Sequence, residues 1–423
     1  MAPLLTLSIE RAVAGGRMLA RHDGRVVLVS GAIPGERVTA RLERVSRQVA
    51  FAATAEVLEP SPSRRDPICD PACGGSVYAH IAIERQRELK ADILDDVFRR
   101  IGRLSLPNPI SVAASPESGY RLRGRLHVRD RRVGFFRERS HRLCDARATQ
   151  QFLPEVVPAV ASLIDSLGSA ADNCEAVLVA ENVAATQRVC HLEAGERQLV
   201  LPEATWTLPD GVTGVTTRSG GRLVAHAGQG RVTDSARDLC GSDAVIPGDA
   251  SWTRTAASFF QGNRYLTGAL LTRVLDRVHG SRVLDLYAGV GLFTVALAAR
   301  GAAVTAVEGD ATSVADMEIN VNRLGAPVVV RELAVEAAVI TAGVGQFDTV
   351  VLDPPRTGVS PDALSGVVGL EGARIVYVSC DPATLARDAA RLTAQGYRLE
   401  AIEAFDLFPN TAHVETLAVF DRV

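Results

Sequence analysis

Two residue types suited to covalent catalysis lie near the C-terminus, one cysteine and one glutamate. The stretch RIVYVSCDP predicts a buried strand that ends at Cys380, and Asp381-Pro382 is typical of an N-cap and first helical position. The dipole of that helix would stabilise a thiolate. If the final strand, which carries Glu415, runs antiparallel, both side chains face one crevice. They predict a nucleophile and a base, with a buried structural cysteine and a surface acid as the alternatives.

A glycine turn follows an earlier buried strand, in RVLDLYAGVGLF (282–293). Gly289 and Gly291 let the backbone approach a ligand where a Cβ would clash. The next strand, AVTAVEGD (303–310), ends in Glu308, where an acid can bind two ribose hydroxyls. These positions predict a nucleotide-type cofactor, with a plain βαβ turn as the alternative.

One acid and one missing glycine indicate which cofactor. A dinucleotide site needs a third glycine, where this chain has Thr294, and it builds a pyrophosphate cradle. Asp285, at the end of the first strand, instead suits a cationic methionyl group. Together with Glu308, it favours an adenosyl cofactor without phosphates.

A Pro-Pro turn follows a third strand, in DTVVLDPPR (348–356). Strand ends line the ligand crevice in doubly wound sheets, so Asp353 should lie beside the cofactor turn. Amino-group methyltransferases often close a similar turn with an aromatic residue that stacks the base. Arg356 occupies that place here, which argues against methylation of an exocyclic amine.

These motifs resemble those of the RNA 5-methyluridine (uracil-C5) methyltransferases, which modify tRNA or 23S rRNA. The matching strings within 258–415 are SFFQGN, DLYAGVGLF, VLDPPR, VSCDPATLARD and HVE. The resemblance implies that S-adenosylmethionine (SAM) is contacted by Gln261, Tyr287, Glu308 and Asp353. It also implies Cys380 as nucleophile and Glu415 as proton acceptor. Leu292 departs from the family, which often has asparagine there, so one cofactor contact is in doubt.

Methylation of uracil C5 needs three groups, and the motifs supply all of them. A thiolate adds to C6 and gives C5 the carbanion character that it needs to take a methyl group. A carboxylate then removes the C5 proton, and loss of the thiol restores the ring. Three rivals remain: a cytosine-C5 RNA methyltransferase, a non-catalytic RNA-binding protein on this fold, and a small-molecule oxidoreductase. The first commonly needs a second cysteine that DPPR lacks, and the glycine pattern argues against the last.

The elements that must position these groups indicate three domains in 423 residues. Residues 1–60 carry short alternating strands and resemble the small TRAM β-barrel that binds RNA. Residues 61–250 form a β-rich central domain, with an amphipathic helix expected within 82–101. Residues 251–423 alternate strands with helices, which predicts an α/β, Rossmann-like class I SAM methyltransferase domain.

Charge is distributed unevenly, although the net charge is only −3. Residues 1–150 hold 26 basic and 17 acidic residues, which suggests an anionic partner for the front half. Lys90 is the only lysine among 46 basic residues, which codon bias explains at least as well as a preference for bidentate phosphate contacts.

One expected strand carries a basic stripe between Tyr120 and Asp130. The basic members are Arg121, Arg123, Arg125, His127 and Arg129, and they alternate with Tyr120, Leu122, Leu126 and Val128. In a strand, this pattern places positive charge on one face and apolar side chains on the other. The stripe is suited to RNA phosphates, with a solvated sheet face as the alternative.

Seven cysteines, an odd number, do not indicate a disulfide framework. Many members of the resembled family hold a [4Fe–4S] cluster with four cysteines, three of them in a Cys-x5-Cys-Gly-Gly-Cys run. Here Cys69, Cys73 and Cys144 remain, and Ser76 replaces the third cysteine of the run. Because three thiolates are a poor set for such a cluster, a vestigial loop is favoured.

Location and partners follow from composition and from the resemblance. No apolar run approaches the ~20 residues that span a bilayer, and no basic n-region precedes the first apolar stretch. We therefore expect a cytoplasmic protein, monomeric, with RNA as its partner. The barrel favours 23S rRNA over tRNA.

Overall fold

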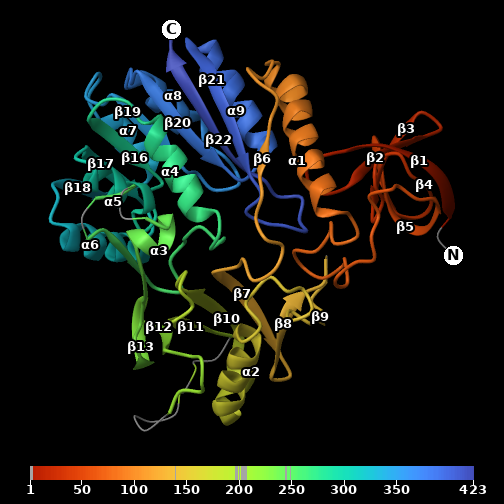
Figure 1. The fold of residues 1–423 in the computed structure, drawn as a ribbon, viewed down its shortest axis with the longest axis horizontal. Helices are drawn as coiled ribbons and strands as arrows, with labels where there is room; N and C mark the ends of the chain where they lie inside the picture. The colour runs from red at the N-terminus through yellow and green to blue at the C-terminus, as the bar shows by residue number, and fades with distance from the viewer. Residues whose placement is uncertain are drawn as a thin grey trace.

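The computed structural model describes residues 3–138, 140–195, 199, 201, 207–242, 245–247 and 249–423. Figure 1 shows a small barrel at one side, a large mixed sheet flanked by helices, and a central sheet below both. This architecture confirms the predicted fold class. Within the described ranges, the helices are too short or too polar to cross a lipid bilayer.

The barrel consists of five strands, closed in the order β1-β2-β3-β5-β4. Their bounds are β1 Leu4–Ala12, β2 Met18–His22, β3 Arg25–Ser30, β4 Arg37–Val45 and β5 Val49–Glu59. Alternate residues such as Leu7, Val27 and Val38 fill its core. Asp23-Gly24 turns the β2–β3 hairpin with both φ angles positive, as a type I′ turn requires. Closure leaves no free sheet edge.

The central sheet has seven strands in the order β13-β12-β11-β10-β7-β8-β9. The bounds are β7 Arg123–Arg129, β8 Arg132–Phe136, β9 Leu143–Cys144, β10 Cys174–Glu181, β11 Arg188–Ala194, β12 Gly214–Ser219 and β13 Arg222–Gly228. Helix α2 (Val156–Ser166) packs on one face, and the 3₁₀ segment η2 (Gly168–Asn173) follows it. Leu126 and Val128 are buried under α2, so the alternation predicted for β7 is confirmed.

The largest sheet has eight strands in the order β18-β17-β16-β19-β20-β22-β21-β6. The bounds are β6 Val112–Ala113, β16 Arg282–Leu286, β17 Ala303–Glu308, β18 Val328–Glu332, β19 Thr349–Leu352, β20 Arg374–Ser379, β21 Tyr397–Phe405 and β22 Glu415–Arg422. Strand β22 runs antiparallel to both neighbours, which meets the condition set above for Glu415 and Cys380 to share one site, and the other pairs are parallel.

Six helices cover the two faces of this sheet. One face is packed by α4 (Thr267–Arg277), α5 (Leu292–Ala299) and α6 (Ala311–Leu324), and the other by α7 (Val335–Thr341), α8 (Pro361–Gly369) and α9 (Pro382–Ala394). Successive strand residues alternate between the two cores: Val376 and Val378 belong to one, and Ile375 and Tyr377 to the other. Both faces are therefore dry, which explains the continuous apolar runs in these strands.

Two segments from early in the chain also associate with this sheet. Helix α1 (Ile83–Val97) and the π-helical turn η1 (Phe98–Gly102) share a hydrophobic core with α9, and β6 extends the sheet beyond β21. Both segments fall within residues 61–250, which were expected to form the central domain. The chain therefore contributes α1 and β6 to the large sheet before it forms the strands of the central sheet. It returns through β14 (Val232–Ser235), α3 (Ala236–Cys240) and β15 (Ser251–Arg254).

Candidate active site

The turn between β16 and α5 has the backbone of a ligand-binding loop. Tyr287, Gly289 and Gly291 have φ values of 60°, 57° and 85°, and for the tyrosine such a conformation is strained. The Gly289 N–H donates to Glu308 Oε2 over 2.9 Å, and the Asp310 N–H donates to Glu308 Oε1 over 2.8 Å. The acid that ends β17 is therefore held against the turn.

Asp285 is a buried acid, and one of its two carboxylate oxygens lacks a hydrogen-bond partner among the described residues. Its Oδ2 accepts a hydrogen bond from Thr294 Oγ1 at 2.5 Å, while Oδ1 has no hydrogen-bond partner among the described residues. Burial raises the pKa of Asp285 to about 7, the Thr294 hydrogen bond lowers it, and the charge of Glu308 raises it. An orphaned carboxylate oxygen beside a glycine turn fits the cationic part of an adenosyl cofactor.

Asp353, just beyond the end of β19, is the second acid of the crevice. Gln261 Nε2 donates to its Oδ2 over 3.1 Å. Burial raises the pKa of Asp353 to about 7, the Gln261 hydrogen bond lowers it, and the charge of Asp285 raises it. The two acids therefore oppose each other's ionisation, which a bound cation would relieve.

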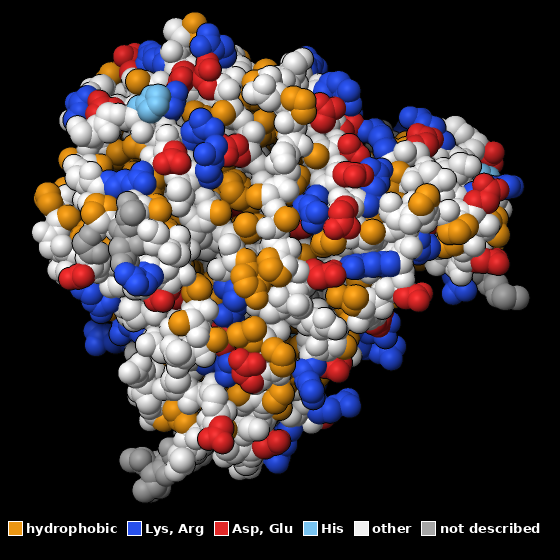
Figure 2. All heavy atoms as spheres, viewed as in Figure 1, with side chains coloured by type: hydrophobic (Ala, Val, Ile, Leu, Met, Phe, Trp, Pro, Cys, Tyr) orange, Lys and Arg blue, Asp and Glu red, His pale blue; other side chains and the backbone are white. Residues whose placement is uncertain are grey.

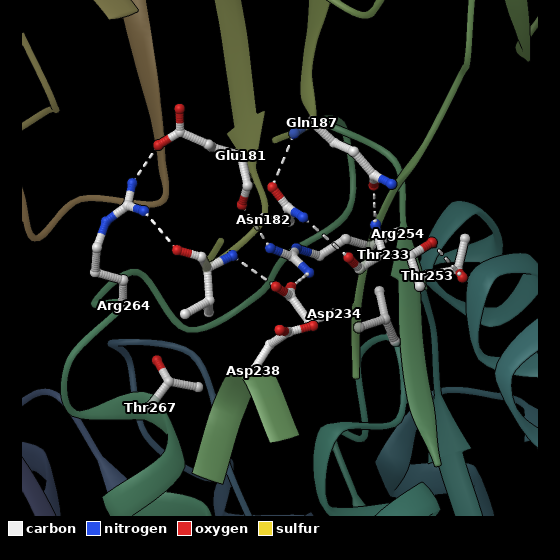
Figure 3. Close-up of polar contacts among 12 residues, drawn as sticks. Glu181, Asn182, Gln187, Thr233, Asp234, Asp238, Thr253, Arg254, Arg264 and Thr267 are labelled. Carbon is white, nitrogen blue, oxygen red and sulfur yellow. Dashed lines mark hydrogen bonds and ion pairs between the residues drawn. The ribbon is translucent and has the colours of Figure 1, made fainter. Parts of the chain in front are cut away.

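The segment that carries Gln261 is anchored by buried ion pairs from the central domain (Figure 3). Arg264, three residues later, pairs with Glu181 at the end of β10 and donates to Gly119 O over 2.8 Å. Arg254, before the segment, pairs with Asp234 and lies over the Phe260 ring at 3.8 Å. Because all four charged groups are buried, their loss would disturb the cofactor side of the crevice.

Cys380 and Glu415 come together at the ends of adjacent strands. The β20–β22 ladder pairs Ser379 with Thr416, so the residues one step beyond lie opposite each other. Glu415 is 3% exposed, whereas Cys380 is partly exposed. Arg356, from the Pro-Pro turn, lies close enough to the thiol to lower its pKa. The structure thus brings together a thiol, a carboxyl group and a guanidinium group.

Burial dominates the electrostatics of this pair. It raises the pKa of Cys380 to about 12; the charges of Glu415 and Asp353 add to the rise, and Arg356 opposes it. Burial and the charge of Asp353 also raise the pKa of Glu415 well above its usual value, and Arg356 lowers it. The expectation of a helix-stabilised thiolate is therefore wrong for the ligand-free protein. Asp381 caps α9 as predicted, accepting from the Thr384 N–H over 2.8 Å.

The predicted arginine stripe runs from solvent toward this crevice. Arg125 and Arg129 are exposed, and Arg125 forms an ion pair with Glu193. Arg121 lies 5.7 Å from the Phe408 ring, and Arg123 lies 5.1 Å from the Phe259 ring. Sequence reasoning missed Phe259, whose side chain is 55% exposed; its place inside the SFFQGN string was the available signal.

The three cysteines considered as cluster ligands do not form a metal site. Cys73 and Cys144 are joined in a disulfide that links two segments 71 residues apart, and Cys69 is free. Within the described residues, no group of three or more His, Cys, Asp or Glu side chains could hold a metal ion. Since two of the three sulfurs are bonded to each other, the residues present do not fit a [4Fe–4S] cluster.

Comparison with known proteins places these features in one family. Residues 244–423 match the family model for tRNA (Uracil-5-)-methyltransferase, and residues 5–54 match the TRAM domain. The chain is 35% identical to the 23S rRNA (uracil(1939)-C(5))-methyltransferase RlmD of Alkalilimnicola ehrlichii, with 96% of this chain and 94% of that protein covered. It is 31% identical to an uncharacterized RNA methyltransferase of Corynebacterium efficiens, covering 99% and 94%.

A solved structure shares the fold over nearly the whole chain. The Pyrococcus abyssi tRNA (uracil-54, C5)-methyltransferase, in complex with S-adenosyl-L-homocysteine, superposes with a TM-score of 0.73. It covers 98% of this chain and 99% of its own, at 24% identity. Sequence identity above 30% over almost the full length then decides the family: the chain belongs to the RNA uracil-C5 methyltransferases.

Proposed function

We propose that this enzyme methylates C5 of a uridine in 23S rRNA, with Cys380 as nucleophile and Glu415 as proton acceptor. The observation that carries the proposal is the pairing of these two side chains at one end of the β20–β22 ladder, next to Arg356. The choice of 23S rRNA rests on the RlmD relatives. A tRNA uridine is the alternative, because the matching family model carries that substrate in its description.

The cofactor side of the crevice is suited to SAM, which supplies an electrophilic methyl group on a sulfonium. Glu308 would bind the ribose hydroxyls, and the turn of Tyr287, Gly289 and Gly291 would face the adenosyl group. Asp285 and Asp353 would face the cationic methionyl part, with Gln261 holding Asp353 in place. A nearby positive charge favours ionised carboxylates, so the pKa values of both acids should fall on binding.

The chemical step starts with loss of the Cys380 proton, for which Asp353 is a candidate acceptor, because its charge acts on the thiol. The thiolate sulfur then bonds to C6 of uracil, and the displaced electron pair gives C5 the carbanion character to take the methyl group. Glu415 receives the C5 proton, the C6–S bond breaks, and the C5–C6 double bond returns. A carboxylate with a raised pKa is the stronger base for that proton.

The RNA would approach along β7. Arg125 and Arg129 can contact phosphates, and blue side chains gather on the side of the central domain that faces the barrel (Figure 2). Arg121 and Arg123 continue the positive charge into the crevice. The target base must leave its stack to reach Cys380, and the exposed ring of Phe259 offers it a surface to stack on.

The test is methyl transfer from labelled SAM to total RNA from a strain lacking this gene, followed by nucleoside analysis and mapping. We expect label as 5-methyluridine at one position of 23S rRNA. Cys380→Ala should abolish transfer and leave SAM binding intact. Label in tRNA would overturn the choice of RNA, and turnover by Cys380→Ala would remove this thiol from the mechanism.

A further inference from the structure

The only lysine of the chain is buried against the catalytic domain. Lys90 lies on α1 with no exposed surface and forms an ion pair with Asp406, which is equally buried. Its Nζ also donates to Phe408 O over 3.2 Å. Helix α1 lies outside residues 244–423, the segment that matches the methyltransferase family model. The ion pair therefore joins a helix from early in the chain to the catalytic domain.

Both acceptors of Lys90 belong to the loop between β21 and β22, residues 406–414, and Glu415 follows directly. A second residue of α1 holds the same loop. Gln86 Nε2 donates to Asn410 Oδ1 over 2.9 Å, and the Asn410 N–H donates to Gln86 Oε1 over 2.8 Å. Asn410 has a φ of 64°, a conformation that such a reciprocal pair can maintain.

The site suits an ammonium group better than a guanidinium. It presents one carboxylate oxygen and one backbone carbonyl to the cation. A lysine satisfies these with a compact charge, whereas an arginine brings five N–H donors in a rigid plane that would be left partly unpaired in a buried site. The chemistry of this position therefore favours lysine over arginine, which the chain uses at its other basic positions.

We propose that Lys90 is a positioning residue, which fixes the β21–β22 loop through Asp406 and Phe408 so that Glu415 reaches the C5 proton. The inference rests on the proposed role of Glu415 as proton acceptor. Among the described residues, the Lys90 ammonium hydrogen-bonds to Asp406 and Phe408, and not to the thiol or the cofactor turn. Its removal should therefore slow proton abstraction and spare both binding steps.

The diagnostic experiment uses the full-length enzyme carrying Lys90→Met, with SAM and an RNA substrate. We expect kcat to fall between about 10- and 100-fold, as for a small misplacement of a catalytic group, with KM for RNA nearly unchanged. The covalent RNA–protein adduct should accumulate as a slow band on denaturing gels, because the adduct forms but loses its proton slowly. Lys90→Arg should not restore normal turnover.

Two further variants separate positioning from general stability. Glu36→Gln breaks another ion pair, between the buried Glu36 of the barrel and the partly exposed Arg64 just after it, and should give no adduct. Lys90→Met combined with Asp406→Asn removes both buried charges, so it should fold if the single variant does not, and it should still accumulate adduct. Turnover restored to the wild-type rate in this double variant, or activity that only follows the folded fraction, would overturn the proposal.

The outcomes also separate this inference from the proposed function. If Glu415→Gln traps the adduct and Lys90→Met does not, the positioning role is wrong and the base assignment stands. If neither variant traps it while Cys380 remains essential, the assignment of Glu415 is wrong, and the inference falls with it.

Discussion

Asp285→Asn should stabilise the ligand-free enzyme and lower its affinity for SAM. The carboxyl is fully buried, keeps one oxygen without a partner among the described residues, and has a pKa of about 7. In the unfolded chain, the same group ionises near its usual value of 3.8. Between pH 3.8 and pH 7, Asp285 is ionised in the unfolded chain but mostly protonated in the folded protein. Ionisation therefore stabilises the unfolded state more than the folded state, and the free energy of unfolding falls as the pH rises. Asparagine has the same shape and no such ionisation.

The pKa difference sets the size of the effect. A rise of about three units costs up to ~4 kcal/mol once both states are ionised, at about 1.4 kcal/mol per unit. At pH 5 the cost is only ~1.7 kcal/mol by the same relation. The advantage of Asp285→Asn should therefore grow by about 2.5 kcal/mol between pH 5 and pH 8. Above pH 8 this gain in the free energy of unfolding should no longer change with pH. At every pH it is reduced by the same amount, the cost of burying the asparagine amide.

Trp252 provides the readout. Its indole N–H donates to Gly291 O over 3.1 Å, directly behind the cofactor turn. The chain has two tryptophans, so Trp206→Phe leaves Trp252 as the single tryptophan, which can be excited selectively. Urea unfolding of this background, with and without Asp285→Asn, would be compared at pH 5 and pH 8.

The pH dependence is what can refute the reasoning. A stability difference that is the same at pH 5 and pH 8 would show that Asp285 ionises normally in the folded protein. A variant that binds SAM as tightly as the parent would show that the unpartnered oxygen does not face the cofactor. Thr294→Val, which removes the hydrogen bond to Asp285, is the control that should raise the pKa of Asp285 further.

Three other perturbations test separate parts of the molecule. Glu415→Gln should leave adduct formation intact and trap the covalent RNA–protein species, seen on denaturing gels; free release of product would remove Glu415 as the base. Cys73→Ser should lower the free energy of unfolding by roughly 2–5 kcal/mol under oxidising conditions and not after reduction, since it opens the link to Cys144. Cys69→Ser is its matched control, and equal loss in both would contradict the disulfide. Arg129→Ala should reduce the salt dependence of RNA binding by about one phosphate contact, measured by anisotropy across salt concentrations. Arg125→Ala should change it less, because Glu193 already neutralises that side chain.

Much of the catalytic half could be predicted from local pattern. Strand ends and helix starts are encoded nearby, so Cys380 at the end of β20 and Asp381 as the cap of α9 follow from a few residues. The antiparallel final strand then brings Glu415 to the same place. The alternation in β7 and the hairpin turns of the barrel are equally local, because turns and period-two patterns are written in short stretches, whereas closure of the barrel also needs the distant pairs β1–β4 and β3–β5.

The rest depends on contacts between distant parts of the chain. The pKa of Cys380 is raised chiefly by burial, which segments from other parts of the chain provide. Strand β6 has two residues and exists only because Ala404 and Phe405 pair with it, so no periodicity could reveal it. Lys90 was visible as an oddity of composition, but its partner lies 316 residues away.

The early return of α1 and β6 to the large sheet has a consequence for synthesis. Val112 pairs with Ala404, and Lys90 with Asp406, so the ribosome releases the first partner of each pair long before the second exists. Contacts of such separation form late, because a long loop must close before they contribute any stability. The barrel can close while translation continues, but the β21–β22 loop can be fixed by α1 only after residues 406–414 have been made. The loop that precedes Glu415 is thus fixed late in synthesis, by partners that were made early.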